Sequence, residues 1–548
     1  MPREIEAKLR PRHKSMAPEE VQQAAQALDG YRFQPQREVE LWDGYFDTDA
    51  YDLIRHGYVL RLRRVDGQIL AGLKGIPLRR GAVVERLEVE VPLPADTPLP
   101  PPAWPPAIQE VLGGLGVEET PLRLLCLLQQ RRSKGLLWPQ VGVPELDGQA
   151  GPLAELSLDR VSVYPPEATT GATHAQPGAQ PWHQFDELEL ELLADSEADA
   201  LRPLVRQLRK ALGLKVAREN KLETALRALS QLEPTPAGPV AGIQPEMPVA
   251  EACRLIWRVQ LMQLVLNEHG ARSGRDPEYI HDMRVAIRRA RTVQRLFVDH
   301  WRRKRVRPFL KRMKQAGRAL GRVRDLDVGL AGLARGRKSW PGMDGQVLRQ
   351  LRRAWRQQRQ QEHAALVAFL DREEWRQFIQ ELDRFCRTPG AGTPKRDRAP
   401  GEALHPYQVR HVFPNTLWHH FSLIRSAEAL LDQGVELSAE TLHGLRVECK
   451  YLRYGLEFSR HLLGEEGEAL IRQLKGLQDY LGHLNDRVVA CKRLQKWQAR
   501  QDGSGPLDAW IEGEMGEIAG MVQEFPGHFR HFIRPENRRR LAIALARL

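Results

Sequence analysis

The chain has 548 residues, of which 42% are hydrophobic and 28% are charged, so it is long enough for more than one compact unit. No apolar run approaches 18 residues, and the N-terminal MPREIEAKLRPRHK lacks an apolar stretch behind its charges, which argues against a membrane span and a secretory signal. Five scattered cysteines without CxxC spacing argue against a disulfide framework or a zinc site. We therefore expect a cytoplasmic protein.

Charge divides the chain into two halves. Residues 1–250 carry 28 Lys and Arg against 35 Asp and Glu, whereas residues 251–548 carry 54 against 35. The net charges of −7 and +19 indicate two modules with different partners. Charge alone leaves open nucleic acid, anionic lipid, another polyanion, or basic helices that are merely kept soluble.

Residues 1–200 have the alternating pattern of β-strands. The segments are EIEAKL, VELWDGYFDT, YVLRLRRV, ILAGLKG, VERLEVEVPL, LAELSLDRVSV and FDELELELL. Two insertions, 92–106 and 164–181, are rich in turn-forming residues and predict loops. Helical periodicity predicts helices at Met16–Leu28 and Glu197–Leu212.

A proline-rich segment, 231–248, predicts a linker between a domain at 1–230 and a helical domain at 249–548. Within the helical domain, HDMRVAIRRAR at 281–291 recurs as HGLRVECKYLR at 443–453, at an offset of 162 residues. The Gly/Pro loop at 388–401 lies between the two copies, which are expected at about 249–388 and 402–548. Such a long period indicates a duplicated helical bundle.

The charged residues of the predicted strands fall on one face. Glu4, Glu6 and Lys8 share a face, as do Arg61 and Arg63. For a single strand, this is the ordinary signature of an antiparallel sheet with one face in water. Repetition over several strands favours instead a sheet curled into a barrel with its charged face inward. There, carboxylates would hold Mg²⁺ or Mn²⁺ and Arg or Lys would hold phosphates.

EIEAK at 4–8 resembles the ExExK signature of the CYTH, or triphosphate tunnel metalloenzyme, family. The resemblance continues in the same order through YFDT (45–48), LRLRR (60–64), LKG (73–75), RLEVE (86–90), RRSKG (131–135) and ELELELL (187–193). It implies an eight-stranded antiparallel β tunnel with flanking helices, which hydrolyses a triphosphate with Mg²⁺ or Mn²⁺.

The same resemblance implies roles for individual residues. The implied phosphate ligands are Lys8, Arg61, Arg63, Lys74, Arg86, Arg131 and Arg132. The implied acids are Glu4 and Glu6, Glu189 and Glu191 for the metal and the attacking water, and Glu88 and Glu90 for the remaining lining. The role of Glu187 stays open, and Lys221 is either a last phosphate contact or an ordinary helix-surface lysine.

The basic residues of the two repeats form stripes on their helices. His281, Arg284, Arg288 and Arg291 lie within roughly 80° of arc. Their counterparts are His443, Arg446, Lys450 and Arg453. A single stripe of this kind is usually a solvated face. Duplicated halves that pair about a pseudo-twofold axis would set both stripes side by side and form a basic groove for a polyanion.

These motifs, with LGRVRDLDV and its repeat LGHLND, resemble the CHAD domain, an all-helical module. The resemblance implies binding of long-chain inorganic polyphosphate in a basic channel. It extends the candidate contacts beyond the two stripes to Lys311, Lys314, Arg472 and Lys475. Structural roles are expected for Asp325 and Asp486, and no acid or second histidine at i+4 supports a metal role for His281 or His443.

The sequence thus predicts an α+β multidomain protein with an N-terminal eight-stranded β tunnel and a C-terminal all-α duplicated bundle. The order of domains resembles bacterial inorganic triphosphatases, which implies a Mg²⁺-dependent hydrolase of inorganic triphosphate that associates with polyphosphate granules. Tripolyphosphate, a nucleoside triphosphate and thiamine triphosphate remain open as substrates. The alternatives are a catalytically idle polyphosphate-binding protein, an adenylate cyclase, and a nucleic-acid-binding protein; the last is disfavoured because no RNP, KH or helix-turn-helix signature is present.

Overall fold

The computed structural model describes residues 3–12, 15–78, 83–94, 97, 100–140, 151–170, 173–193, 198–233, 240–339, 345–397, 405–435, 437–499 and 507–548. By its contacts the chain forms two compact units. The first contains residues 1–240 and 262–279, and the second contains residues 241–261 and 280–548. The long helix α6 (Val249–Ser273) contributes its first half to the second unit and its second half to the first.

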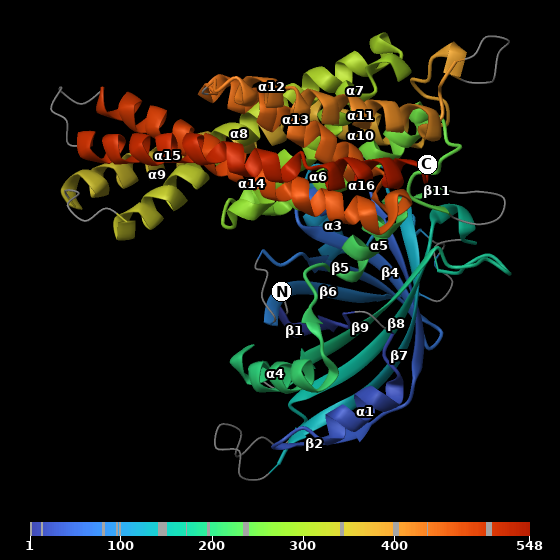
Figure 1. Ribbon diagram of the computed structural model, residues 1–548. Helices are drawn as coiled ribbons and strands as arrows, with labels where there is room; N and C mark the ends of the chain where they lie inside the picture. The colour runs from blue at the N-terminus through green and yellow to red at the C-terminus, as the bar shows by residue number, and fades with distance from the viewer. Residues whose placement is uncertain are drawn as a thin grey trace. The chain divides into compact units, whose positions relative to one another are not determined.

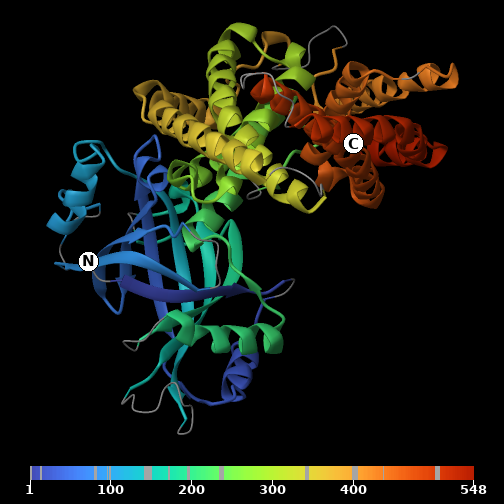
Figure 2. The ribbon, with the colours of Figure 1, turned by 90° about the vertical axis from the view of Figure 1, so that its left-hand side faces the viewer.

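The first unit is built around an antiparallel sheet that closes on itself (Figures 1 and 2). In spatial order, its eight strands are β1 (Arg3–Arg10), β6 (Val83–Leu93), β5 (Gln68–Gly75), β4 (Tyr58–Val65), β3 (Val39–Asp47), β7 (Arg123–Pro139), β8 (Ala154–Tyr164) and β9 (His183–Leu192). The ring is completed by β1 pairing with β9, with Glu6 opposite Glu191 and Lys8 opposite Glu189. The predicted eight-stranded antiparallel tunnel is therefore confirmed. Outside the ring, β2 (Tyr31–Pro35) pairs with β7 and β10 (Lys215–Val216) pairs with β1.

The apolar side chains of the tunnel strands face outward and are covered by helices. Leu9 and Leu188 pack in one core with Leu204 of α4 (Leu201–Leu212), and α1 (Pro18–Gln26) adds Val21 to that core. Both helices lie within the segments that the periodicity predicts. The charged residues of the same strands consequently point into the tunnel, because side chains alternate along a strand.

Three further helices of this unit lie outside the two segments predicted as helices. These are α2 (Asp52–Arg55), α3 (Pro106–Gly114) and α5 (Lys221–Ser230). The helix α3 starts at the end of the proline-rich insertion, where proline is well tolerated in the first turn, and packs Ile108 and Leu112 against the outward face of β4. In the predicted linker, β11 (Leu232–Glu233) pairs with β12 (Val240–Ala241).

The second unit is helical throughout its described length. After α6, its helices are α7 (Pro277–Leu296), α8 (Arg303–Ser339), α9 (Gly345–Leu370), α10 (Glu373–Arg387), α11 (Val409–Arg425), α12 (Ala427–Asp432), α13 (Ala439–Phe458), α14 (Arg460–Gln498), α15 (Asp508–Phe532) and α16 (Pro535–Leu545). Short 3₁₀ turns, η3 (Val298–His300) and η4 (Lys395–Asp397), occupy two of the connections. None of the described helices is both long enough and apolar enough to cross a membrane.

The two predicted copies reappear as matching helices. The helices α7 and α13 carry the repeated basic motifs, contain 20 residues each, and begin 162 positions apart. Each is followed by a long helical segment, α8 of 37 residues or α14 of 39 residues, and α14 is broken at Gly464, whose φ is 63°. At Gly455 of α13 an added Cβ would lie 2.5 Å from a methyl carbon of Leu417, so glycine permits the close approach of α11 to this helix.

Candidate functional site

The tunnel encloses a cavity of about 220 Å³ whose lining is mostly charged. Its lining residues are Glu4, Lys8, Tyr45, Val59, Arg61, Arg63, Lys74, Gly75, Arg86, Glu88, Glu90, Arg132, Glu189, Glu191, Asn220, Lys221 and Leu222. The first strand, the adjacent strands β4 to β6, and β7 and β9 each contribute charged side chains, and α5 adds the last three residues. Most of the sequence-predicted tunnel residues are thus brought into one compartment.

On one side of the cavity, arginines are held by carboxylates. Arg63 donates to both carboxylate oxygens of Asp43, at 2.8 and 2.9 Å, and Arg61 donates to Glu90 at 2.6 Å. Although burial works against the charged form, these partners keep the pKa of Arg61 above its usual value and that of Asp43 below it. Both arginines are therefore fixed cations.

A second cluster surrounds Glu189. Its carboxylate contacts Lys8, lies 3.0 Å from the Arg132 guanidinium and lies 3.1 Å from the Lys221 ammonium. Burial alone would raise the pKa of Glu189, but these cations hold it well below its usual range. Arg132 also forms a two-pronged pair with buried Asp159, at 2.7 and 2.8 Å, and Lys221 contacts the same carboxylate. Lys221 is therefore part of the lining rather than a surface lysine.

A third group consists mainly of carboxylates. Glu88 and Glu4 share a hydrogen bond; burial and this bond raise the pKa of Glu88, while the bond helps to hold that of Glu4 low. Burial and the neighbouring carboxylates, chiefly Glu4 and Glu88, raise the pKa of Glu191 to about 7. Lys74 lies 3.1 Å from Glu4 and 2.6 Å from Glu88, and burial beside Arg61 lowers the pKa of this lysine to about 8.

The third group fits a divalent cation. Crowded carboxylates with hard oxygen donors are the ligands that Mg²⁺ and Mn²⁺ prefer, and a cation would relieve the repulsion that raises the pKa of Glu191. Nearby, Glu6 is 2% exposed and its Oε1 has no hydrogen-bond partner, while its Oε2 accepts from Arg86 at 2.9 Å. Glu4 and Glu6 each contact two cations through Oε2, and Glu189 contacts three, so the unpartnered Oε1 of Glu6 and the carboxylate of Glu191 are the oxygens most open to a metal.

One predicted residue lies outside the tunnel. Arg131 is exposed on the outer face of β7, whereas the next residue, Arg132, points inward. The prediction for Arg131 is wrong because adjacent residues of a strand face opposite sides of a sheet. The open question of Glu187 also has a structural answer, since this buried carboxylate accepts from Arg10 Nε at 2.7 Å.

Sequence reasoning missed two buried acids of the tunnel, Asp43 and Asp159. Asp43 shares its strand face with Asp47, and Asp159 shares its face with Glu155, but the acids of each pair are four residues apart, so neither strand has the closely spaced carboxylates that marked β1, β6 and β9. A signal was available at Asp43: it shares the inward face of β3 with Tyr45, opposite the apolar side of VELWDGYFDT.

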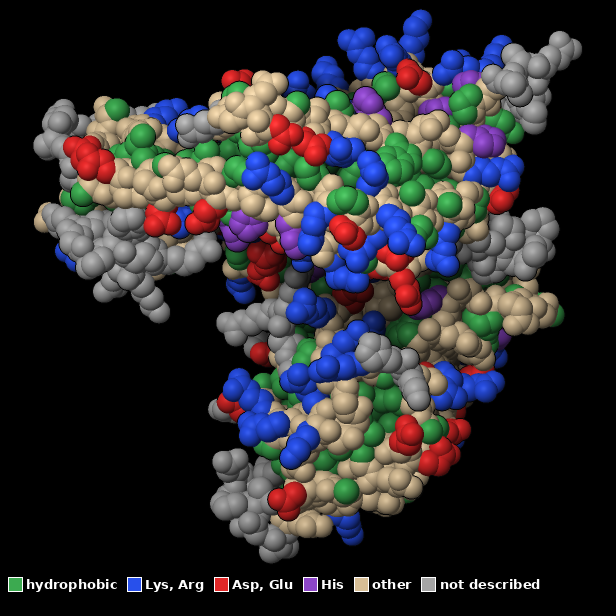
Figure 3. Space-filling model, in the orientation of Figure 1, with side chains coloured by type: hydrophobic (Ala, Val, Ile, Leu, Met, Phe, Trp, Pro, Cys, Tyr) green, Lys and Arg blue, Asp and Glu red, His purple; other side chains and the backbone are tan. Residues whose placement is uncertain are grey.

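The stripes of the helical unit lie beside each other. Arg288 Nε of α7 donates to the Tyr454 hydroxyl of α13 at 2.8 Å, and Arg289 pairs with Glu457 at 2.7 Å. Burial, together with nearby Arg446, Arg288 and Arg284, lowers the pKa of Lys450 to about 7. Like charges from both copies therefore lie close together, and Lys and Arg side chains also gather along the upper edge of this unit in Figure 3.

The aromatic ring of Tyr454 lies beneath these basic side chains. Tyr454 is 1% exposed, and the guanidinium carbons of Arg288, Arg289 and Arg453 lie 5.2 to 5.9 Å from its ring centre. These cation–π contacts partly offset the crowding of positive charge. The ring is buried under the arginines, so it does not offer a free face for base stacking.

The remaining helical candidates have varied surroundings. Arg284 lies 3.2 Å from Asp325, and the His443 ring contacts Asn485 at 3.0 Å, in line with structural roles for these α8 and α14 residues. His281 lies on the same helix as Arg284. Five candidates are exposed: Arg291, Lys311, Lys314, Arg472 and Lys475. Among the described residues, no contact joins Lys311, Lys314, Arg472 or Lys475 to Lys450.

Comparison with known families agrees with this geometry. The CYTH domain model matches residues 2–226, and the CHAD domain model matches residues 255–495. The chain is a CYTH domain followed by a CHAD domain. CYTH domains form the family of triphosphate tunnel phosphohydrolases, which are typically dependent on divalent metals, and CHAD domains are associated with polyphosphate.

Solved structures resemble one or the other domain. The CHAD domain of Ricinus communis is 22% identical, covers 56% of this chain and 94% of its own, and has a TM-score of 0.39. Hippeastrum HpAC1, described as an adenylyl cyclase with a dominant triphosphatase activity, is 18% identical, with 40% and 94% coverage and a TM-score of 0.26. PptA from Streptomyces chartreusis is 12% identical, with 52% and 98% coverage and a TM-score of 0.40. No curated protein matches the chain.

The carboxylate group generates a prediction about metal binding. Replacing Glu191 with Gln should weaken Mn²⁺ binding at least about 10-fold, because it removes one oxygen ligand and its charge. Since the pKa of Glu191 is raised to about 7, the wild-type carboxyl is protonated below that pH, and Mn²⁺ affinity should rise from pH 6 to pH 8. Electron paramagnetic resonance of free Mn²⁺ measures both effects.

The control is Glu85→Gln, which removes an exposed acid from the outer face of β6. This variant should retain wild-type affinity and pH dependence. Equal Mn²⁺ affinity in the Glu191 and Glu85 variants would exclude the carboxylate group as the metal site.

Proposed function

We propose that the tunnel hydrolyses inorganic triphosphate with Mg²⁺ or Mn²⁺. The proposal rests on one observation. A single cavity is lined by fixed cations in one part and by crowded carboxylates in another. The cations suit the oxygens of a phosphate chain, and the carboxylates suit the metal that accompanies it. The match to the CYTH domain supports the same chemistry.

In this proposal each charged group has a defined task. Arg61, Arg63 and Arg132 bind phosphate oxygens and neutralise the charge that develops on the leaving phosphate. Glu4, Glu6 and Glu191 hold the cation, which polarises the phosphoryl group when bound.

The lining favours inorganic triphosphate over a nucleotide. Among the described lining residues, Tyr45 is the one aromatic side chain; it is 4% exposed, and its hydroxyl lies 3.5 Å from Asp43. A nucleoside or thiamine group would gain little stacking there. Turnover of tripolyphosphate, ATP and thiamine triphosphate should therefore be compared, with cyclic AMP formation from ATP as the sign of a cyclase.

Two adjacent arginines provide a matched test of the tunnel. Arg132→Ala should lower kcat/KM for tripolyphosphate on the order of 100-fold, because it removes a fixed cation from the cavity. Arg131→Ala removes the same side chain from the outer face one residue away and should leave turnover near wild type. Phosphate release under excess Mg²⁺ measures both variants, and similar losses in the two would contradict the proposed site.

For the helical domain, we propose binding of long-chain polyphosphate in the groove between α7 and α13. The groove gathers Arg284, Arg288, Arg446 and Lys450 without a free aromatic face, which fits a polyanion that carries no bases. The match to the CHAD domain supports this choice. Nucleic acid is the second candidate, and competition by RNA or DNA at equal phosphate concentration distinguishes it.

Loss of these four cations together should remove most polyphosphate binding by the full chain. The matched control replaces four exposed cations elsewhere, Lys492, Lys496, Arg538 and Arg539, and so changes the net charge equally. Affinity of the control should fall only modestly, and wild-type affinity should drop steeply with salt because bound counterions are released. Fluorescence anisotropy with labelled polyphosphate measures these effects; equal losses would mean that the charge acts diffusely.

Lys450 should make this binding depend on pH. The pKa of Lys450 is about 7 in the free protein, where Asp486 raises it and the surrounding arginines lower it. A polyanion that neutralises Arg446, Arg288 and Arg284 will therefore raise this pKa. Binding therefore takes up a proton, so affinity should increase as pH falls from 9 to 7 and level off below. Lys450→Arg should abolish this dependence, and titration calorimetry in buffers of different ionisation enthalpy measures the proton uptake.

A further inference from the structure

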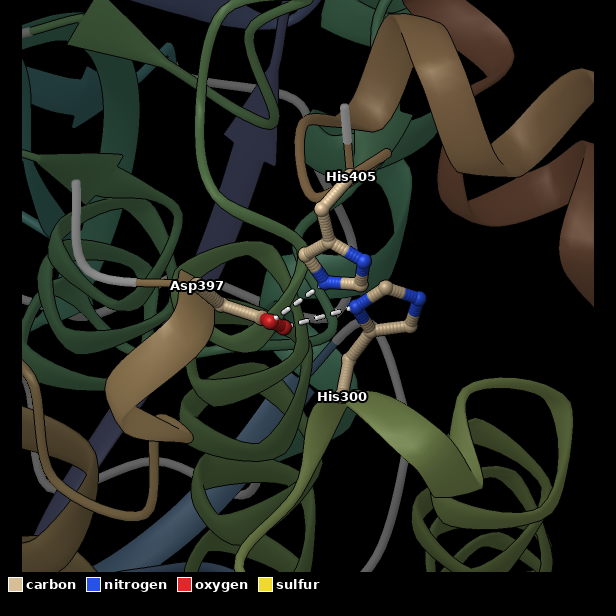
Figure 4. Close-up of side chains that lie close together, drawn as sticks. All are labelled: His300, Asp397 and His405. Carbon is tan, nitrogen blue, oxygen red and sulfur yellow. Dashed lines mark hydrogen bonds and ion pairs between the residues drawn. The ribbon is translucent and has the colours of Figure 1, made fainter. Parts of the chain in front are cut away.

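Outside both proposed sites, two histidines converge on one buried carboxylate in the second unit. His300 ends η3, Asp397 ends η4, and His405 lies shortly before α11. His300 Nδ1 lies 2.8 Å from Asp397 Oδ2, and His405 Nε2 lies 2.8 Å from Oδ1 of the same carboxylate. Figure 4 shows both ring nitrogens directed at Asp397.

We propose that these three residues form a zinc site. One ligand atom from each lies within 4.8 Å of the other two, and two imidazoles with one carboxylate are a donor set that Zn²⁺ accepts. A tetrahedral zinc ion holds its N and O ligands about 3.3 Å apart, so the 2.8 Å contacts need to open by only about half an ångström. Water would complete the coordination of the ion.

Burial supports a cation at this position. Asp397 is 1% exposed and His300 is 9% exposed, so the carboxylate is shielded from water, and a bound cation would balance its charge. The Arg396 guanidinium lies 3.4 Å from Asp397 Oδ1, beyond ordinary hydrogen-bond length, and its other end donates to the Asp299 carbonyl at 2.9 Å. Arg396 is about half exposed, so it can move aside when an ion binds.

The site would fasten the segment between the two helical repeats to the turn between α7 and α8. A backbone bond from Arg302 N to the Gly392 carbonyl, 2.8 Å long, already joins the same two segments. Zinc would add a stronger link, since metal binding that requires folded ligands stabilises the folded state.

The test is zinc titration of the full chain after chelator treatment, with excess Mg²⁺ to occupy the oxygen sites and a chromophoric chelator as competitor. Wild type should bind one Zn²⁺ at this site. His405→Gln retains an N–H that can donate to Asp397 but removes the imidazole ligand, so zinc affinity should fall on the order of 100-fold. His411→Gln, the same change at an exposed position of α11, should not alter zinc affinity.

Substitution with Co²⁺ gives a second readout that needs no variant. The five cysteines are buried and none belongs to the cluster, so the visible spectrum should show tetrahedral d–d bands without a thiolate charge-transfer band. Absence of zinc binding by the wild type, or equal affinity in the His405 and His411 variants, would overturn the proposal and leave Asp397 as the centre of a simple hydrogen-bond network. A thiolate band would also overturn it.

Discussion

The tunnel depends on charge compensation inside a closed sheet. Its strands turn their apolar faces outward to the covering helices, so their charged faces are enclosed together. Buried charges are tolerated only when they are paired and hydrogen-bonded, and each tunnel cation has an acid within reach. Asp43 and Asp159 serve this purpose for Arg63 and Arg132, which positions both guanidinium groups without substrate.

This compensation affects what the tunnel can accept. Cations and carboxylates are close to balanced there, so a bare triphosphate would add negative charge that the protein alone does not neutralise. A divalent ion on the side of Glu4 and Glu191 restores the balance, and phosphate oxygens can then replace carboxylates as partners of Arg61 and Lys74. Metal and substrate are therefore expected to bind with positive coupling, each strengthening the other.

The sequence predicted these features unevenly, for physical reasons. Repeated alternation revealed the inward acids and cations of β1, β6 and β9, because side-chain direction has a period of two along a strand. It misplaced Arg131, since two consecutive arginines satisfy either register, and it missed Asp43, because the acids of β3 do not recur at every second position. The duplicated helices were visible as a repeat. The convergence of His300 and His405 on Asp397 was not, because the loop that brings them together follows no periodic rule.

The helical groove shows the opposite electrostatic design from the tunnel. In the tunnel each cation has a carboxylate partner. In the helical unit, by contrast, three arginines add to the effect of burial in lowering the pKa of Lys450, and the nearby acid Asp486 acts to raise it. Such crowding destabilises the folded unit, and the cation–π contacts over Tyr454 offset only part of it. Maintaining unbalanced charge is useful if the ligand supplies the missing anions. Under the proposed functions, the tunnel would exchange carboxylate partners for phosphate during a reaction, while the basic residues of α7 and α13 would hold a polyanion continuously.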